Sequence, residues 1–260
     1  MNNKNLKERI GGKMQTSQES SKVNNNTTET ALTTVTSDYA ALTSNALDVI
    51  NENLKNQPLS YQLFDVIKSP SGGMTVFTVP GLSGDEVEKE LTGIIIDYTT
   101  PRAYWDTPDP VEGTPPNCYS RDSIISHEGK ACVQCEFNDF GSKNGGETQA
   151  KACKEQVQIL LLRPDNIIPV IVRVPVSSKV LFQKYMIRLI GKMMPLSGVV
   201  TKITLEKATN KTGQPYAIYN FEAVQELSPE EAATAKVFGQ KFTEVLTAAD
   251  APVIDIQEAG

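Results

Sequence analysis

Four cysteines gathered in one short stretch constrain the fold more than any other feature of this chain. They are Cys118, Cys132, Cys135 and Cys153, which lie within 36 residues in the spacing C-x13-C-x2-C-x17-C. A Cys-x2-Cys pair supplies two thiolates from one tight turn, and two single cysteines can complete a closed tetrahedral zinc site. The pattern therefore predicts a structural Zn²⁺ that staples a loop and leaves no open coordination position for chemistry.

Two alternatives to this ligand set remain open. The four cysteines could instead form two disulfides or remain unrelated thiols, although the polar N-terminus, Met1 to Met14, has no apolar signal-peptide core. We therefore expect a cytoplasmic chain, in which clustered cysteines favour a metal. The only histidine, His127, lies five residues before Cys132 and could replace Cys118. We expect it to be an exposed loop residue instead.

The composition is that of a soluble globular chain. It is 39% hydrophobic and 22% charged over 260 residues, enough for one sizeable core with appendages or two small cores. The longest apolar stretches, Ile159 to Leu162 and Ile167 to Val176, are too short to span a bilayer. No membrane partner is expected.

Charge is unevenly distributed along the chain. The net charge is −6, yet residues 151–215 carry 11 Lys/Arg and only 3 Asp/Glu, whereas residues 91–150 have a net charge of −5. A basic block of this kind suits phosphate, because lysine and arginine release condensed counterions when they bind a nucleic acid. The alternative is a solvated basic face that pairs with the acidic remainder of the chain.

The order of polar and apolar segments predicts four parts. Residues 1–36 are polar, lack aromatic residues and are expected to be disordered. Residues 37–59 are expected to form a short helix and a linker. Residues 60–226 should form the main domain, with the cysteine loop at 118–153. Residues 227–260 should form a C-terminal helix, with a capping-box start at Ser228 to Glu231, and an acidic tail.

Six or seven short strands are predicted in the main domain. The patterns indicate a hairpin of 61–67 and 74–79, a buried strand at 91–98, a hairpin of 157–162 and 167–174, and a strand pair of 199–207 and 216–224. A late helix should start at Ser177 or Ser178 and end near Met194. The sequence therefore predicts a mainly β fold, a small Greek-key β-barrel with one inserted helix, a zinc-binding loop and a C-terminal helix.

Enzymatic motifs are missing from the sequence. It contains no phosphate-binding loop, no dinucleotide-binding fingerprint and no H-E-x-x-H. His127 and Glu128 are adjacent and lie too close to Cys132 for the zinc deaminase pattern. With four cysteines available, no metal position need stay open. We therefore expect a protein without catalytic residues.

Aromatic and basic residues around the cysteines point instead to a single-stranded nucleic acid, which binds by base stacking in a basic groove. The candidates for stacking are Tyr98, Tyr104, Trp105 and Phe137. The candidates for phosphate contacts are Arg102, Lys151, Lys154, Arg173, Lys184, Arg188 and Lys202. The alternatives are ordinary core packing for the aromatic residues and a solvated helix face for Lys184 and Arg188, which are four residues apart.

The arrangement of these segments resembles a known family. Residues 132–142 read Cys-Val-Gln-Cys-Glu-Phe-Asn-Asp-Phe-Gly-Ser, and Lys-Ala-Cys-Lys at 151–154, a hairpin, a helix and a strand from Val200 to Glu206 follow them. This order resembles the zinc-containing single-stranded DNA-binding proteins of phages and mobile elements, over about residues 60–225. The chain departs from the bacterial housekeeping form, whose acidic tail ends in a short apolar tip, because it ends Asp-Ile-Gln-Glu-Ala-Gly.

The resemblance implies an OB-fold with an inserted zinc site. It also implies cooperative, largely sequence-independent coating of single-stranded DNA in replication or recombination, with proteins of those processes as candidate partners in the host cytoplasm. The alternative function is a zinc-ribbon subunit that mediates protein–protein interactions in a phage replication, transcription or virion assembly.

Overall fold

The computed structural model places most of the chain from Tyr39 onward. It describes residues 39–42, 46–55, 57, 59–60, 63–107, 110–111, 114–143, 149–164, 166–211, 213–248 and 254. The expected disordered segment at 1–36 lies outside the described residues, as does the acidic tail apart from Ile254.

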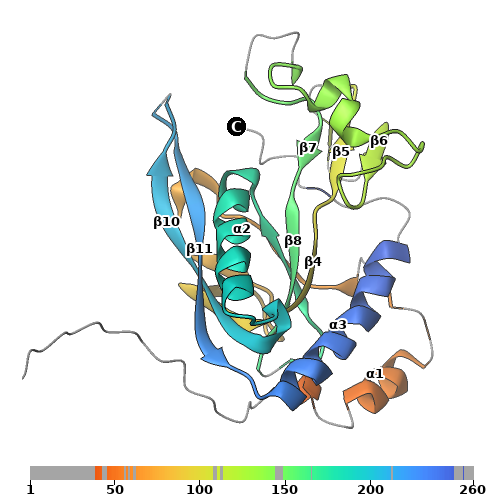
Figure 1. Ribbon diagram of the computed structural model, residues 1–260, viewed down its shortest axis with the longest axis vertical. Helices are drawn as coiled ribbons and strands as arrows, with labels where there is room; N and C mark the ends of the chain where they lie inside the picture. The colour runs from red at the N-terminus through yellow and green to blue at the C-terminus, as the bar shows by residue number, and fades with distance from the viewer. Residues whose placement is uncertain are drawn as a thin grey trace, which may run out of the picture. The chain divides into compact units, whose positions relative to one another are not determined.

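A six-stranded mixed sheet forms the centre of the fold, in the order β1-β9-β8-β4-β10-β11 (Figure 1). All neighbours are antiparallel except β1 and β9. The predicted buried strand, the second hairpin and the last strand pair are confirmed. The six strands are β1 Val66–Ile67, β4 Glu90–Thr99, β8 Val157–Leu162, β9 Val170–Val174, β10 Val199–Thr209 and β11 Pro215–Glu226.

Both faces of the sheet are apolar, because long aliphatic side chains follow one another without alternation in the central strands. On β4, Ile95 belongs to one buried cluster, while Ile94 and Ile96 belong to the other. Such continuous apolar runs are typical of strands that are buried on both faces. Each face therefore needs a covering layer.

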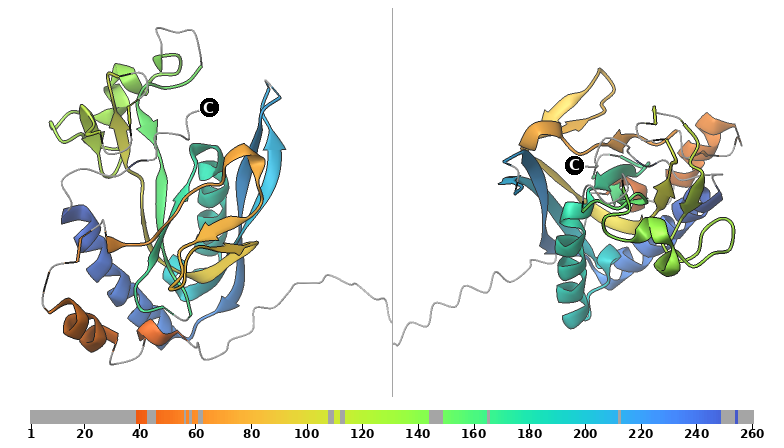
Figure 2. Two further views of the ribbon diagram at one scale, coloured as in Figure 1. Left: turned by 180° about the vertical axis from the view of Figure 1, so that it is seen from behind. Right: turned by 90° about the horizontal axis from the view of Figure 1, so that it is seen from above.

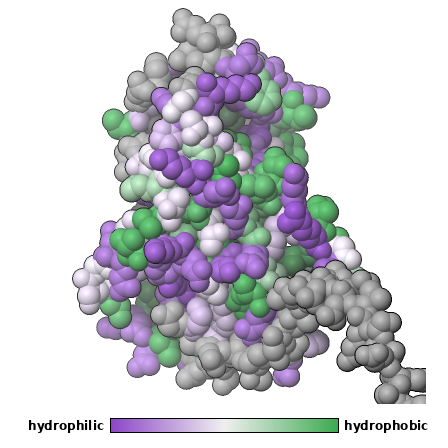
Figure 3. Space-filling view, turned by 90° about the vertical axis from the view of Figure 1, so that its left-hand side faces the viewer, coloured by the Kyte–Doolittle hydropathy of each residue, from purple (hydrophilic) through white to green (hydrophobic). Residues whose placement is uncertain are grey.

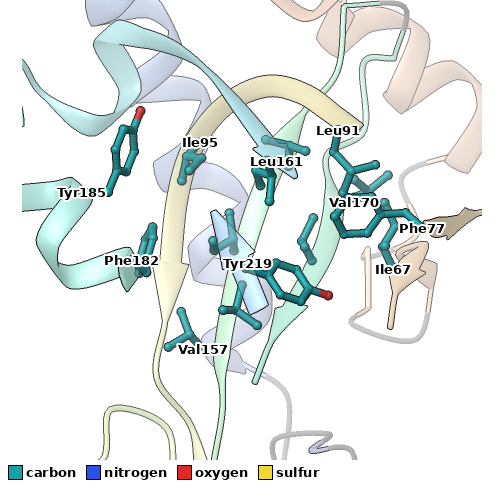
Figure 4. Close-up of a cluster of buried hydrophobic side chains, with 14 of the residues drawn as sticks. Ile67, Phe77, Leu91, Ile95, Val157, Leu161, Val170, Phe182, Tyr185 and Tyr219 are labelled. Atoms are coloured by element: carbon teal, nitrogen blue, oxygen red, sulfur yellow. The ribbon is translucent and has the colours of Figure 1, made fainter. Parts of the chain in front are cut away.

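Helix α2, Val176–Gly191, covers the first face. Phe182 and Tyr185 point from this helix toward β4 in Figure 4, and the Tyr185 hydroxyl hydrogen-bonds Thr201 Oγ1 at 2.7 Å. The predicted serine cap is wrong: the residue before the helix is Pro175, and Ser178 Oγ instead accepts from the Tyr219 backbone N–H of β11 at 3.0 Å. The buried Ser178 thus ties helix to sheet.

Helix α3, Pro229–Ala248, covers the second face through Phe238 and Phe242. The predicted capping box is present, since Glu231 Oε2 accepts from the Ser228 backbone N–H at 3.0 Å and Ser228 Oγ accepts from the Glu231 N–H at 3.3 Å. Two N-terminal elements, η1 Ala40–Leu42 and α1 Ala46–Leu54, precede the sheet. The described residues therefore hold three α-helices around a sheet-rich core.

The predicted hairpin of residues 61–67 and 74–79 is wrong. β1 pairs with β9, while β2, Phe77–Val79, pairs with β3, Glu86–Glu88. The reason is the turn η3, Ser71–Gly73, where Gly72 and Gly73 have φ of 63° and 68° and lead the chain away from β1. Glycine adopts this left-handed conformation without steric cost.

The strands that the structure describes do not close into a barrel, so the predicted β-barrel is not formed. β1 and β11 are the two edges of the sheet. Ser69, just after β1, hydrogen-bonds the Tyr219 hydroxyl at 3.0 Å and donates to the Arg173 carbonyl oxygen at 3.3 Å. The segment after β1 therefore lies between β9 and β11, where the closing strand pair of a barrel would form.

A second, three-stranded sheet carries the cysteines. We call residues 102–155 the cysteine module. Its strand order is β6-β5-β7, and Figure 2 shows it as a separate lobe beyond the ends of β4 and β8. The first strand of this sheet, β5, starts directly after Pro101. The elements are β5 Arg102–Tyr104, β6 Cys118–Ser120, β7 Lys154–Glu155 and the short turns η4 Cys132–Gln134 and η5 Glu136–Asn138.

Candidate metal and nucleic-acid site

All four cysteines line one pocket of about 680 Å³ in the cysteine module. They reach it from different elements: Cys118 from β6, Cys132 and Cys135 from the η4 turn, and Cys153 from the residue before β7. All four are free thiols, so the two-disulfide alternative is not seen. Residues separated by as much as 36 positions are therefore brought to one place.

Backbone hydrogen bonds hold the thiols there. The Cys135 N–H donates to the Cys132 carbonyl oxygen at 3.3 Å, which closes the tight turn expected of a Cys-x2-Cys pair. The Cys153 N–H donates to the Phe137 carbonyl oxygen at 2.8 Å, and the Cys132 N–H donates to that of Ile124 at 2.8 Å. Backbone hydrogen bonds within the cysteine module therefore fix the positions of Cys132, Cys135 and Cys153.

The environment of the pocket raises the pKa of two of the four thiols. Burial raises the pKa of Cys153 to about 12, with Arg102 acting in the opposite direction. Burial, and then the negative charge of Glu128, also raises the pKa of Cys118. Thiolate is the form that binds metals, and a bound metal deprotonates its thiol ligands.

The donor set fits zinc in kind, because four thiols without disulfides line one pocket and thiolate is a preferred zinc ligand. Among the residues that the structure describes, however, no group of three or more His, Cys, Asp or Glu side chains is gathered closely enough to hold a metal ion. The zinc site stays a prediction.

His127 does not line this pocket. Its ring stacks on Tyr119, with 4.4 Å between centroids, and its Nδ1 accepts from the Tyr119 backbone N–H at 3.3 Å. The side chain is otherwise exposed, as we expected of a loop histidine. This geometry favours Cys118 over His127 as the fourth ligand.

Two of the four predicted stacking residues lie together at the pocket. The rings of Tyr104 and Phe137 are parallel within 9°, with centroids 3.9 Å apart, and both line the pocket. Burial, followed by the charges of Asp106 and Glu136, raises the pKa of Tyr104, so its phenol stays neutral. The two rings thus lie face to face beside the cysteines, and each covers one face of the other.

The other two predicted stacking residues have internal partners. Trp105 is half-buried, and its Nε1–H donates to the Thr114 carbonyl oxygen at 2.9 Å. Tyr98 packs against the core under α2, edge-on to Phe182 with 5.2 Å between ring centroids. Tyr98 is therefore a packing residue in this structure.

Three of the predicted basic residues belong to the cysteine module. Arg102 is only 7% exposed and donates to Glu155 at 2.9 Å. Lys151 donates to Asn138 Oδ1 at 3.1 Å and lies 4.5 Å from the centre of the Phe140 ring. Lys154 is partly buried, and burial together with the charge of Lys143 lowers its pKa to about 8.

The remaining predicted basic residues are not brought to this pocket. Arg173 is 4% exposed on β9, and Lys202 forms an ion pair with Glu222 at 2.8 Å. Lys184 and Arg188 are exposed on α2. Lys202 shares a face of β10 with Val200, under α3, whereas α2 lies on the opposite face of the sheet. These four residues do not form one continuous surface.

Lys143 and Glu155 were not recognised from the sequence. Lys143 lies in a glycine-rich stretch whose composition is typical of a flexible tip. Its N–H nevertheless donates to the Ala150 carbonyl oxygen at 3.1 Å, and its positive charge lowers the pKa of Lys154. Glu155 pairs with both Arg102 and Lys179. The available signal was their closeness to the ends of the cysteine loop.

No protein-family model, curated protein or solved structure matches the chain. Among the described residues, no helix is both long and apolar enough to cross a membrane.

Proposed function

We propose that this chain is a non-catalytic protein that coats single-stranded DNA in replication or recombination, and that a zinc-stapled cysteine module forms part of its DNA-binding surface. One juxtaposition carries the proposal: the stacked Tyr104 and Phe137 line the cysteine pocket, and Lys151 of the same module hydrogen-bonds Asn138, the residue after Phe137. Lys154 pairs with Ala103 on the neighbouring strand, so its side chain shares the face of Ala103 and not that of Tyr104, which leaves Lys151 as the lysine on the Phe137 side.

An OB-like architecture would explain where this module lies. The chain runs through β4, β8, β9, α2, β10 and β11, so a helix separates the third and fourth of five strands. An OB-fold binds oligonucleotides through the loops after its first and fourth strands. The cysteine module follows β4, and the tight turn between β10 and β11 follows the fourth strand. We regard the open sheet as an OB-like sheet whose closure is interrupted by the segment after β1.

A pocket at the turn between β10 and β11 also supports the OB-like assignment. A hollow of about 510 Å³ lies at the turn between β10 and β11 and is lined by Asn210, Gln214 and Tyr216 from that hairpin. Figures 1 and 2 show the hairpin and the cysteine module extending toward the same end of the sheet. An extended strand of DNA that crosses this end would meet both.

Zinc would be held by Cys118, Cys132, Cys135 and Cys153. Its contribution when bound is structural: it cross-links β6, the η4 turn and the start of β7, and four thiolate ligands leave no open position. The residues around the zinc ion would have separate roles in binding. Tyr104 and Phe137 would stack bases, while Lys143, Lys151 and Lys154 would contact phosphates. Arg102 would hold the module together through Glu155.

Fluorescence titration with oligo-dT tests the proposal. Trp105, the only tryptophan, follows Tyr104 directly, so its emission should be quenched when the site fills. Tyr104→Ala and Phe137→Ala should each weaken binding by about 5- to 150-fold, since one stacked base contributes about 1 to 3 kcal/mol. The logarithm of affinity should fall with the logarithm of salt concentration.

A charge-matched comparison completes this test. Lys151→Ala with Lys154→Ala should lower the salt slope by about 1.4, because single strands contribute about 0.7 per neutralised phosphate. Lys236→Ala with Lys241→Ala removes the same charge from exposed positions of α3 and should leave the slope unchanged. Affinity that is independent of salt, or confined to duplex DNA, would overturn the proposal.

A further inference from the structure

The solvent-facing side of α2 carries an unusual row of aliphatic residues. Val176 and Val180 are each 56% exposed, Ile187 is 65% exposed and Ile190 is 66% exposed. At 100° per residue these four positions fall within one narrow arc, opposite the buried Phe182, Tyr185 and Leu189. The row extends for about 21 Å along the helix. Exposed apolar patches of this kind mark interaction surfaces.

One side of the helix next to this row is purely basic, and it turns away from the row toward the C-terminal end of α2. Lys184, Arg188 and Lys192 follow one another at intervals of four residues, all exposed. The sequence from Val176 to Lys192 contains no acidic residue. Lys179, on the other side of the row, forms an ion pair with Glu155. Among the described residues, none of the three exposed cations forms an ion pair. The surface therefore offers apolar contact bordered by unneutralised positive charge.

We propose that this face of α2, defined by Val176, Val180, Ile187, Ile190 and the basic side, docks an acidic amphipathic helix of a partner protein. The charge complementarity is direct: glutamate or aspartate beside the apolar stripe of the incoming helix would pair with Lys184 and Arg188. The apolar stripe would cover the valine and isoleucine row. Recognition of an amphipathic helix through such spaced anchors is a recurring mode.

Other occupants fit this surface less well. Single-stranded DNA stacks on aromatic rings, and this face has only aliphatic side chains. Two copies of the face would bring two basic sides together, and like charges across an interface are repulsive. A bilayer would require deep insertion of the apolar side, but the aromatic side chains of α2 are buried against the sheet. On the face seen in Figure 3, hydrophobic side chains occur in separate patches between hydrophilic ones.

A fluorescein-labelled 21-residue peptide with leucine on one helical stripe and glutamate elsewhere is the probe. Its controls are a scrambled peptide of the same composition and a version with lysine in place of glutamate. By fluorescence anisotropy, the full chain should bind the acidic amphipathic peptide at least tenfold more tightly than either control. Equal affinity for the scrambled peptide, or tighter binding of the lysine version, would overturn the proposal.

Variants of the exposed face locate the binding. Val180→Ser with Ile187→Ser should weaken the acidic peptide at least tenfold, and Lys184→Glu with Arg188→Glu should do the same. Val237→Ser is the matched control, since Val237 is 55% exposed on α3 and lies outside the surface. Circular dichroism should show all variants folded, because the altered side chains are exposed. A loss of affinity in Val237→Ser equal to that in the double variants would contradict the assignment.

Three further measurements distinguish an acidic helix from DNA, a membrane or a second copy of the chain as the partner that binds this face. The affinity for oligo-dT should be unchanged in Val180→Ser with Ile187→Ser, so this inference and the proposed DNA-binding function can fail independently. Binding to vesicles of phosphatidylcholine with phosphatidylglycerol that is lost in Val180→Ser with Ile187→Ser would assign the face to a membrane instead. Sedimentation showing a dimer that the same double variant dissociates would assign it to a second copy of the chain. Either result would overturn the docking of an acidic helix.

Discussion

The carboxylate of Glu155 accepts from the Arg102 guanidinium at 2.9 Å and also pairs with Lys179 at the start of α2. Arg102 lies on β5 and Glu155 on β7, so the first contact joins two strands of the cysteine module. The second contact joins the module to the helix that covers the main sheet. This one carboxylate therefore links the cysteine pocket to the core of the protein.

Glu155→Gln should destabilise the protein by about 3 kcal/mol, because it leaves the cationic Arg102 buried without an opposite charge. The side chains of Arg102 and Glu155 are only 9% and 14% exposed, so solvent screens them little. Urea unfolding measures the change. Glu222→Gln, at an ion pair whose glutamate is 65% exposed, is the control and should cost less than about 1 kcal/mol. Equal effects would contradict this role of Glu155.

Gly239 allows α3 to lie directly on β4. A Cβ atom at this position would stand 2.5 Å from the Ile96 carbonyl oxygen. Gly239→Ala should therefore destabilise the protein by about 2 kcal/mol, as overpacking forces the helix away from the sheet. Gly191→Ala is the control, because nothing lies within 4 Å of its added Cβ and alanine favours a helix by about 0.5 to 1 kcal/mol. Thermal unfolding should move in opposite directions in the two variants.

Local signals predicted the elements that are made by neighbouring residues. The apolar runs on either side of Arg163 to Asn166 form β8 and β9, and the Ser228 to Glu231 pattern forms a capping box. Long-range partners were not predictable, because the pairing of β1 with β9 joins Val66 to Ile171. Ser178 shows the same limit, since its preference for a helix cap is overridden by a hydrogen bond to Tyr219.

The candidate site was predicted in part for a similar reason. Close spacing identified the cysteines, and the structure brings all four to one pocket. Arg173 and Lys202 were predicted to contact phosphates from residue type alone. In the structure Arg173 is buried on β9, and Lys202 forms an ion pair with Glu222 on the main sheet. The stacking of Tyr104 on Phe137 joins residues 33 positions apart and depends on how the loop closes. Sequence patterns carry no information on that closure.

Burial raises the pKa of the Tyr185 phenol to about 12 from its ordinary 10, while the hydrogen bond between Tyr185 and Thr201 acts in the opposite direction. The folded state therefore holds this proton more tightly than the unfolded chain does, and its stabilisation is full below pH 10 and is lost as pH rises toward 12. By pH 11 the loss should reach about 1.4 kcal/mol.

Tyr185→Phe tests this assignment through urea unfolding at pH 8 and pH 11. The variant should be less stable at pH 8 by about 1 to 2 kcal/mol, since Thr201 loses its partner, but its stability should fall less between the two pH values. Thr201→Val is the control, because it removes the hydrogen bond and keeps the titrating phenol. Parallel pH dependence in Tyr185→Phe and the wild type would exclude Tyr185 as the responsible group.

Cys135→Ser should abolish binding of the proposed zinc ion, because one of four thiolate ligands is lost and burial raises the pKa of Cys118 and Cys153, so that three ligands are less able to hold the metal. Metal analysis of the purified chain should fall from about one zinc per chain to none. Amide exchange should accelerate in the η4 and η5 turns, which adjoin the lost ligand, but not in β8, which is buried in the main sheet. His127→Ala should keep its zinc, since that ring stacks on Tyr119 outside the pocket. Loss of zinc from His127→Ala, or full zinc in a folded Cys135→Ser, would show that the four cysteines are not the ligand set.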